Sequence, residues 1–360
     1  MFTFNLLFSN LSFGQINYPF TKEGNNNLQA YWYNIPSDSV KNKDNDEIIF
    51  NFVSLLQIYG PVISSSFKIQ AEVYSASGKN CFDRTFHIPR SKTEDDYTVD
   101  IRDGFFKIEC PVKKLPENPY KIVIAIKSGF KEYKKEIKCR YHKLSGKITY
   151  FNGEPAKAFL AICPDAFLEK NMAGVWSDSS GNYEIELPER IYNAITCFYE
   201  NYMSESKEFL ETWAWHIIMD SDENLDFKVG TCEIYNLNAW VNNGGANIYF
   251  ISFRPIDLNL ARRKKGDEYV DMAPYSEKED IIVKVNGRNV KILSLQKYYE
   301  TGTRTAYLLQ VDRNGLERIG KQTVSLEYNK KIEIDEKSVE SNGIGYFQFY
   351  LNFRGLSKYH

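Results

Sequence analysis

The tetrapeptide Trp213-Ala214-Trp215-His216 holds the residue types of this chain that are best suited to contact a ligand. In a strand, alternate side chains point to the same face, so Trp213 and Trp215 share one face and His216 lies on the other. Two tryptophans on one face could stack on sugar rings, or they could fill the seam between two packed modules. The sequence shows no carboxylate or nucleophile partner that would make His216 a catalytic base. We therefore predict ligand binding, without catalysis, for this group.

A second aromatic group, Tyr31-Trp32-Tyr33, lies nearer the N-terminus. Strand alternation places Tyr31 and Tyr33 on one face and Trp32 on the other. If this part of the chain forms a barrel of about eight strands, one of these faces lines an interior that can hold one small ligand. Core packing is the alternative use of the same side chains. We predict all three residues as further candidate ligand contacts.

The acidic segment 220–224 (DSDEN) begins like a calcium-binding loop. Leu225 stands where such a loop needs a glycine, and Thr231 stands where it needs a bidentate glutamate. We therefore predict a solvated acidic loop and no metal site. The sequence also lacks a G-x-S-x-G motif, a P-loop and a G-x-G-x-x-G motif, so we predict no catalytic residues and no cofactor.

Charge narrows the range of partners. The 360 residues carry 45 basic and 47 acidic side chains, and the net charge of -2 gives no strong field toward nucleic acid. The basic cluster 262–265 (RRKK) is followed by Asp267 and Glu268, which is typical of a solvated loop. No apolar run reaches the roughly 20 residues that a membrane-spanning helix needs. We predict no nucleic-acid partner and no membrane span, and we keep a glycan, an apolar small molecule and a protein as candidate partners.

The N-terminus and the cysteines bear on location. Residues 1–20 lack a basic region, and Asn5, Ser9 and Asn10 interrupt their apolar run, so they make a poor signal peptide. We expect a first pair of strands there and a cytoplasmic location by default, or a secreted one if a signal was removed. The six cysteines stand far apart without a C-x-x-C pair, and we expect them to be reduced and buried.

Alternation of apolar and polar residues is the main structural pattern. Segments 67–73 (FKIQAEV), 183–187 (YEIEL) and 324–328 (VSLEY) alternate without interruption, as half-buried strands do. Aromatic residues, at 15%, also favour sheets. Asn-Gly pairs that predict hairpin turns stand at 152–153, 286–287, 314–315 and 342–343. Only segment 204–213 could form a short helix. The pattern predicts an all-β, multi-domain protein with blocks at residues 1–142, 143–230 and 231–360.

The second block carries the clearest resemblance to a known family. Its segments 146–155 (GKITYFNGEP) and 178–188 (DSSGNYEIELP) resemble the two hairpins that open a carboxypeptidase regulatory-like domain. In this motif Gly181 makes the turn, and Tyr183 fills the apolar face of the strand that follows. The resemblance implies a small transthyretin-like β-sandwich without catalytic residues, which serves as a spacer, a docking module or a glycan contact.

The other two blocks show fainter resemblances. Segment 99–106 (VDIRDGFF) and the spacing of the strands around it resemble hydroxyneurosporene-hydratase-like proteins, which are lipocalin-like barrels that bind or transform apolar polyenes. An irregular β-sandwich is the alternative for this first block. In the third block, 283–288 (VKVNGR) and 320–326 (GKQTVSL) are similar to strands of Ig-like β-sandwiches.

Three functional hypotheses follow from these observations. The first is a non-enzymatic binding protein whose β-modules use aromatic patches to bind a glycan, an apolar small molecule or a protein. The second is a lipocalin-like hydratase or cyclase that acts on an apolar polyene or polyketide. The third is a structural spacer without a ligand. Because one fold serves many functions, the choice depends on the site itself.

Overall fold

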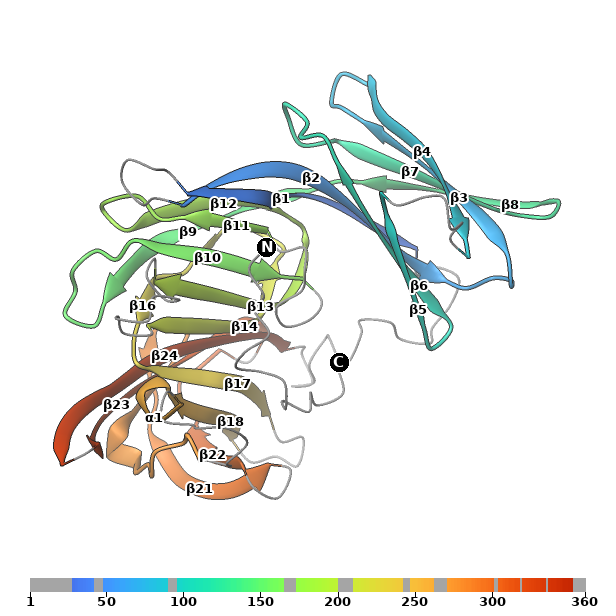
Figure 1. Cartoon of the computed structure of the whole chain (residues 1–360). Helices are drawn as coiled ribbons and strands as arrows, with labels where there is room; N and C mark the ends of the chain where they lie inside the picture. Colours follow the sequence, from blue (N-terminus) through green and yellow to red (C-terminus); the bar gives the residue numbers. More distant parts are fainter. Residues whose placement is uncertain are drawn as a thin grey trace.

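The computed structural model shows a chain built almost entirely of strands (Figure 1). The structure describes residues 28–41, 48–89, 96–164, 173–199, 210–241, 247–261, 271–300, 304–317, 319–334 and 336–351. These residues form 24 strands, one short α-helix and one 3-10 helix. The prediction of an all-β, multi-domain protein is therefore confirmed. The strand pair expected in residues 1–20 and the basic cluster 262–265 lie outside the described residues.

Two four-stranded sheets face each other in the first part of the chain. Their strand orders are β1-β2-β6-β5 and β4-β3-β7-β8. Alternating apolar residues of both sheets fill one core, which includes Trp32, Phe86 and Phe106. The strands are β1 (Gln29–Lys41), β2 (Ile48–Pro61), β3 (Phe67–Tyr74), β4 (Asn80–Ile88), β5 (Thr98–Arg102), β6 (Phe105–Val112), β7 (Lys121–Ser128) and β8 (Lys131–Lys138).

This arrangement decides between the two alternatives for the first block: the lipocalin-like barrel is wrong, and the block is a sandwich. A barrel needs every strand to pair on both sides. Among the described residues, the outer strands β1, β5, β4 and β8 each pair with one neighbour only. Where β8 approaches the start of β1, a side chain makes the contact, because Lys135 Nζ donates to the carbonyl oxygen of Leu28 at 2.7 Å.

The long β1–β2 hairpin contributes to two cores at once. Successive residues of a strand point to opposite faces. Trp32 accordingly lies in the first core, whereas its neighbour Tyr33 lies in the core of the second block. Their partners on β2, Leu56 and Leu55, divide between the two cores in the same way. The hairpin is therefore a shared layer between the first block and the second.

A single eight-stranded sheet joins the second block to the third. Its order is β11-β10-β13-β14-β24-β23-β19-β20. At its middle, β14 and β24 run parallel, with Trp213 beside Gly345 and Trp215 beside Phe347. The strands are β10 (Ala158–Cys163), β11 (Ala173–Trp176), β13 (Arg190–Tyr199), β14 (Glu211–Met219), β19 (Ile281–Val285), β20 (Arg288–Asn289), β23 (Gly320–Ile334) and β24 (Lys337–Leu351).

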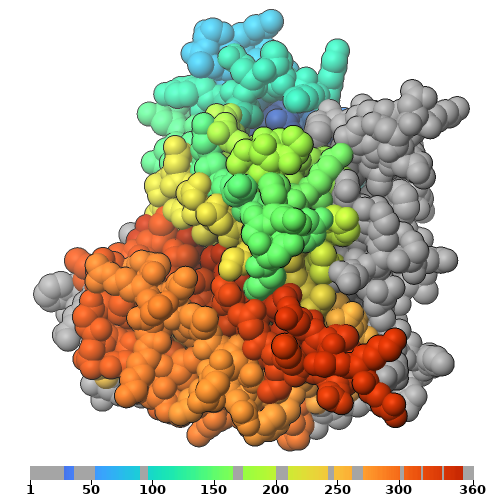
Figure 2. Space-filling model, turned by 90° about the vertical axis from the view of Figure 1, so that its left-hand side faces the viewer, coloured from blue at the N-terminus to red at the C-terminus, as the bar shows by residue number. Residues whose placement is uncertain are grey.

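Two smaller sheets complete the sandwiches of the second and third blocks. The first has the order β12-β9-β15 with β16 also on β9, and the other has the order β17-β18-β22-β21. In Figure 2 the second block stands between the first block above and the third below. The elements are β9 (Tyr141–Tyr150), β12 (Asn182–Pro188), β15 (Glu223–Asn224), β16 (Phe227–Val229), β17 (Cys232–Val241), β18 (Ile248–Asp257), β21 (Ile292–Glu300), β22 (Arg304–Asp312), α1 (Leu258–Ala261) and η1 (Lys278–Asp280).

The hairpin that carries the family resemblance has a turn that only glycine fits. Gly181 has φ of +81°, and a Cβ there would lie 2.3 Å from the carbonyl oxygen of Ile148. Tyr183 points into the second core, and its hydroxyl donates to the carbonyl oxygen of Leu225 at 2.7 Å. The local geometry suits the motif, and membership of the family stays a prediction.

Helices contribute little to the described part of the chain. Strand β14 begins at Glu211, so the end of the segment expected as a short helix is strand, and residues 204–209 lie outside the described residues. No helix among the described residues is long and apolar enough to cross a membrane.

Candidate functional site

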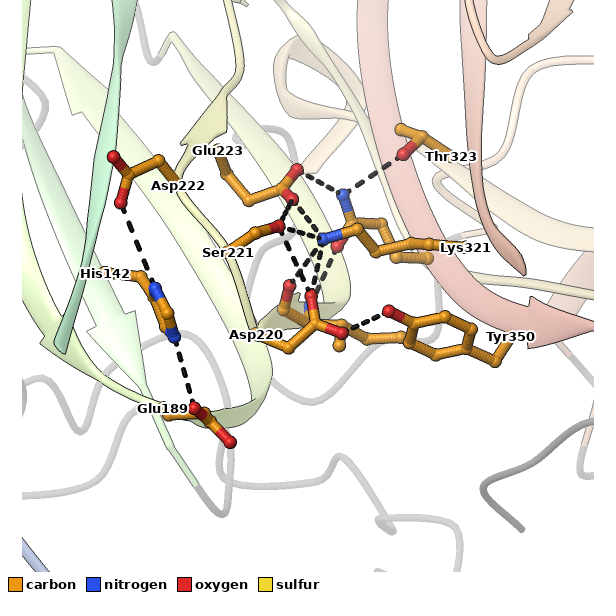
Figure 3. A network of polar contacts seen from close by, with 11 residues as sticks. His142, Glu189, Asp220, Ser221, Asp222, Glu223, Lys321, Thr323 and Tyr350 are labelled. Atoms are coloured by element: carbon orange, nitrogen blue, oxygen red, sulfur yellow. Dashed lines mark hydrogen bonds and ion pairs between the residues drawn. The ribbon is translucent and has the colours of Figure 1, made fainter. Parts of the chain in front are cut away.

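A lysine ammonium group lies at the centre of the acidic segment 220–224 (Figure 3). Lys321 reaches it from β23, and its Nζ lies 2.8 Å from Asp220 Oδ1 and 3.2 Å from Ser221 Oγ. The same Nζ donates to Glu223 Oε1 and to the carbonyl oxygen of Ile218, the latter at 3.3 Å. Of the three positions that resembled calcium ligands, only Asp220 contacts this cation from the third block, whereas Asp222 Oδ1 accepts from Lys143 N at 2.8 Å.

Side chains of β24 extend this network on the other side. Tyr350 donates its hydroxyl hydrogen to Asp220 Oδ2. The amide of Gln348 bridges the two blocks, since its Nε2 donates to Glu223 Oε2 at 3.0 Å and its Oε1 accepts from Ile218 N at 2.8 Å. We name Asp220, Glu223, Lys321, Gln348 and Tyr350 the junction network.

The contacts of the junction network favour the charged forms of Lys321 and Asp220. Burial works against the charge of Lys321, but hydrogen bonds and attraction from Asp220 and Glu223 outweigh it and raise the pKa of Lys321. Burial likewise opposes the charge of Asp220, and the contacts with Lys321 and Tyr350 outweigh it and lower the pKa of Asp220. A nucleophilic lysine must be neutral. The electrostatics therefore favour a structural ion pair over a reactive amine.

His142 lies near this network between two carboxylates (Figure 3). Its Nε2 is 3.3 Å from Glu189 Oε2, and its Nδ1 is 4.0 Å from Asp222 Oδ1. Within the described ranges, no group of three or more His, Cys, Asp or Glu side chains is arranged to hold a metal ion.

The predicted tryptophan platform lies inside the seam between β14 and β17. Trp213 and Trp215 share one face, as expected, and their rings stack at 5.0 Å with an interplanar angle of 13°. They are 1% and 8% exposed, and Tyr235 packs edge-on against Trp215 at 5.0 Å. Trp215 Nε1 donates to the carbonyl oxygen of Ile234 at 3.0 Å. A ligand could reach these rings only if the seam opened, and ligand stacking here stays a prediction.

His216 occupies a special backbone position next to the tryptophans. Its φ is +54°, and its Nδ1 lies 2.7 Å from the carbonyl oxygen of Gln348. Burial lowers the pKa of His216, although this hydrogen bond acts in the opposite direction. After His216, Ile217 returns to the core that holds Ala214, although strict alternation would place it with the tryptophans. The histidine therefore marks a local twist of β14 at the junction.

The first aromatic group also lies at a boundary between blocks. Trp32 is 1% exposed in the first core, while Tyr31 and Tyr33 face the second block, as alternation predicted. Arg190 of β13 lies 4.2 Å from the ring centre of Tyr31 and donates from Nη1 to the Tyr33 hydroxyl at 3.3 Å. The group thus packs the β1–β2 hairpin onto the second block, and its contact with a ligand stays a prediction.

The structure brings together two buried glutamates that sequence reasoning missed. Glu211 and Glu233 are 1% and 3% exposed, and burial together with the charge of Glu211 raises the pKa of Glu233. Trp213 Nε1 donates to Glu211 Oε1 at 2.9 Å. The charge of Arg254 acts on Glu233 from β18. One indication was available in the sequence: Glu233 interrupts the otherwise apolar segment 232–235 (CEIY).

Comparisons with known proteins give no family. No family model and no curated protein matches the chain. Among solved structures, it is similar to BcpA, the major pilin subunit of Bacillus cereus, with 10% identity and a TM-score of 0.17 over 59% of this chain and 70% of that one. It is also similar to a cross-linked bacterial adhesin from Mobiluncus mulieris, with 7% identity and a TM-score of 0.15 over 90% of this chain and 99% of that one. A complex of Dpr2 Ig1-Ig2 with DIP-Theta Ig1-Ig3 gives 7% identity and a TM-score of 0.14 over 81% and 93%. Scores this low support no argument about function.

Proposed function

We propose that this chain is a non-enzymatic binding protein in which three β-modules are held in fixed positions and present ligand-binding surfaces. The observation that carries the proposal is the continuous eight-stranded sheet, because β14 of the second block and β24 of the third pair directly. Modules that share a backbone ladder cannot swivel without breaking hydrogen bonds.

Two further contacts support a rigid arrangement. The β1–β2 hairpin places its opposite faces in the first core and the second core, so it is packed on both sides. The junction network adds charged and polar contacts between the acidic segment 220–224 and strands β23 and β24. A fixed spacing between modules is what a protein needs if it displays several surfaces to one partner.

The fold of the first block removes the main argument for the alternative hypothesis, a lipocalin-like hydratase or cyclase. A hydratase or cyclase of the lipocalin-like kind requires a barrel interior, and the first block is a sandwich whose core holds large apolar side chains. A structural spacer would have the same rigid arrangement. Ligand binding is therefore the property that distinguishes a binding protein from a spacer.

Small-angle scattering of the full chain, combined with calorimetry, tests the proposal. We expect one conformation to fit the scattering profile, and the second and third modules to melt in a single transition because they share a sheet. A profile that requires an ensemble of module orientations, or separate transitions for these two modules, would contradict it.

A further inference from the structure

An open cleft of about 660 Å³ lies on the second module. It is formed by β9, by the end of β11, by the start of β12 and by the segment that follows β15. Its lining includes several polar side chains and two aromatic residues, Trp176 and Tyr183, of which Tyr183 is buried in the second core. The lining residues that matter for its chemistry are Lys147, Trp176, Asn182, Glu184, Asn224 and Asp226.

Backbone contacts hold the walls of the cleft in place. The Asp178 carboxylate accepts hydrogen bonds from the backbone N–H groups of Ser180 and Asn182, at 2.9 and 2.8 Å, which fixes the turn into β12. On the adjacent strand β9, Lys147 pairs with Asn182, and its backbone N donates to Asp226 Oδ1 at 2.9 Å. A site that is already ordered loses less free energy when a ligand binds.

The cleft combines an aromatic wall with neutral amides and carboxylates. Trp176 is partly exposed and packs against Phe159, with ring centres 5.3 Å apart, so its orientation is supported from behind. Asn182 and Asn224 each offer an amide donor and acceptor, while a carboxylate has room for about four hydrogen bonds. Apolar ring faces bordered by hydroxyl groups are the feature that sugars present, and this lining matches both parts.

The charge of the cleft lining favours neutral sugars over acidic ones. Asp178, Glu184 and Asp226 line the cleft with only Lys147 to oppose them. Glu184 is further engaged by Lys143, whose Nζ lies 3.0 Å from its Oε1. The remaining negative charge disfavours uronic and sialic acids and leaves neutral sugars acceptable.

We propose that this cleft binds a neutral saccharide, with a sugar ring against Trp176 and its hydroxyls hydrogen-bonded to Glu184 and Asp226. The inference rests on the proposed function and gives it a ligand class and a site. Because the cleft is wide and open, it suits a segment within a chain as well as a free end.

Titration of the full chain with neutral oligosaccharides tests the site. The probes are cellohexaose, maltohexaose, mannohexaose, xylohexaose and chitohexaose, each up to about 5 mM, a range that covers weak single-site binding. Polygalacturonate is the acidic comparison. Tryptophan fluorescence and calorimetry report binding. We expect at least one neutral probe to bind and polygalacturonate not to bind.

Matched variants assign the binding to the cleft. Trp176→Ala should weaken the affinity at least about tenfold, as loss of an aromatic anchor does. Trp240→Ala should leave it unchanged, because Trp240 is 41% exposed on the third module. Trp176→Phe keeps a ring against Phe159 and should bind at an intermediate level, which guards against simple misfolding of the alanine variant.

Three results would overturn the inference: no neutral probe binds, binding is equal in Trp176→Ala, or binding is lost in Trp240→Ala. These results are separable from failure of the proposed function. A rigid chain that binds no sugar would support the proposed arrangement of modules and contradict the saccharide site. A flexible chain that binds sugar through Trp176 would support the site and contradict the arrangement.

Discussion

Glu211 and Glu233 lie with their carboxyl groups buried close together in the seam between β14 and β17. Two ionised carboxylates in one buried site repel each other, so their proximity favours a proton on one of them. Burial is the largest cause of the raised pKa of Glu233, and the charge of Glu211 raises it further, while the charge of Arg254 acts against them. The folded chain therefore retains the Glu233 proton to a higher pH than an exposed glutamate would.

The first prediction concerns pH. We expect this pair to lower the free energy of unfolding as pH rises above 4.5, the ordinary pKa of glutamate. The unfolded chain releases the Glu233 proton near that pH, whereas the folded chain retains it, so folding becomes less favourable until the folded pKa is passed. Urea unfolding at a series of pH values measures the effect.

Glu233→Gln is the matched comparison, because its amide can donate to Glu211 at any pH. The variant should therefore show a flatter dependence of stability on pH than the native chain. If the difference in stability between the two proteins does not change with pH, the shared proton is not present.

The second prediction concerns the junction network. Lys321→Met removes the ammonium and leaves Asp220 and Glu223 facing each other, so we expect a loss of about 1–3 kcal/mol in the free energy of unfolding. Lys331→Met changes an exposed lysine on the same strand and should cost less than about 0.5 kcal/mol. Equal effects of the two variants would show that the network does not stabilise the junction.

The third prediction separates packing from binding at the seam. Trp213→Ala should cost about 3–5 kcal/mol, since it empties a buried site and removes the partner of Glu211. Trp240→Ala, at a 41% exposed position, should cost less than about 1 kcal/mol. Thermal or urea unfolding measures both. If the Trp213→Ala protein is as stable as the native chain, packing does not explain the tryptophan pair, and ligand binding becomes the better explanation.

The fourth prediction tests the close approach at Gly181. Gly181→Ala adds a Cβ only 2.3 Å from the Ile148 carbonyl oxygen at φ of +81°, whereas Gly153→Ala adds one in open space at φ of +88°. The second change should cost about 1 kcal/mol, from backbone strain alone. Gly181→Ala should lower the free energy of unfolding by clearly more. Equal losses in urea unfolding would show that the backbone near Ile148 moves to accept the added Cβ.

Local patterns predicted much of this fold because a half-buried strand requires apolar and polar residues to alternate along the sequence. Segment 67–73 alternates and is half-buried in β3, and the alternating segment 324–328 lies in strand β23. The same rule placed Tyr31 and Tyr33 opposite Trp32. The rule states which side chains share a face, but it does not state what covers that face, so it could not distinguish a barrel interior from the layer between two modules.

The residues missed by sequence reasoning depend on long-range pairing. Lys321 stands 101 positions after Asp220 in the sequence, and no local pattern links it to the acidic segment 220–224. Glu211 lay in a segment interpreted as a short helix, which concealed its place at the start of β14. His216 was recognised by its chemistry, whereas its positive φ and its bond to the Gln348 carbonyl oxygen were not predicted.

The parallel pair of β14 and β24 has a consequence for the synthesis of the chain. His216 and Gln348, which face each other at this pair, are 132 residues apart. At ordinary ribosomal speeds β14 emerges roughly ten seconds before β24. During that time the second module displays an unpaired central strand edge, which is the type of surface that recruits other chains. A chain that stops before β24 would therefore keep the edge of β14 unpaired, and we expect such a chain to aggregate.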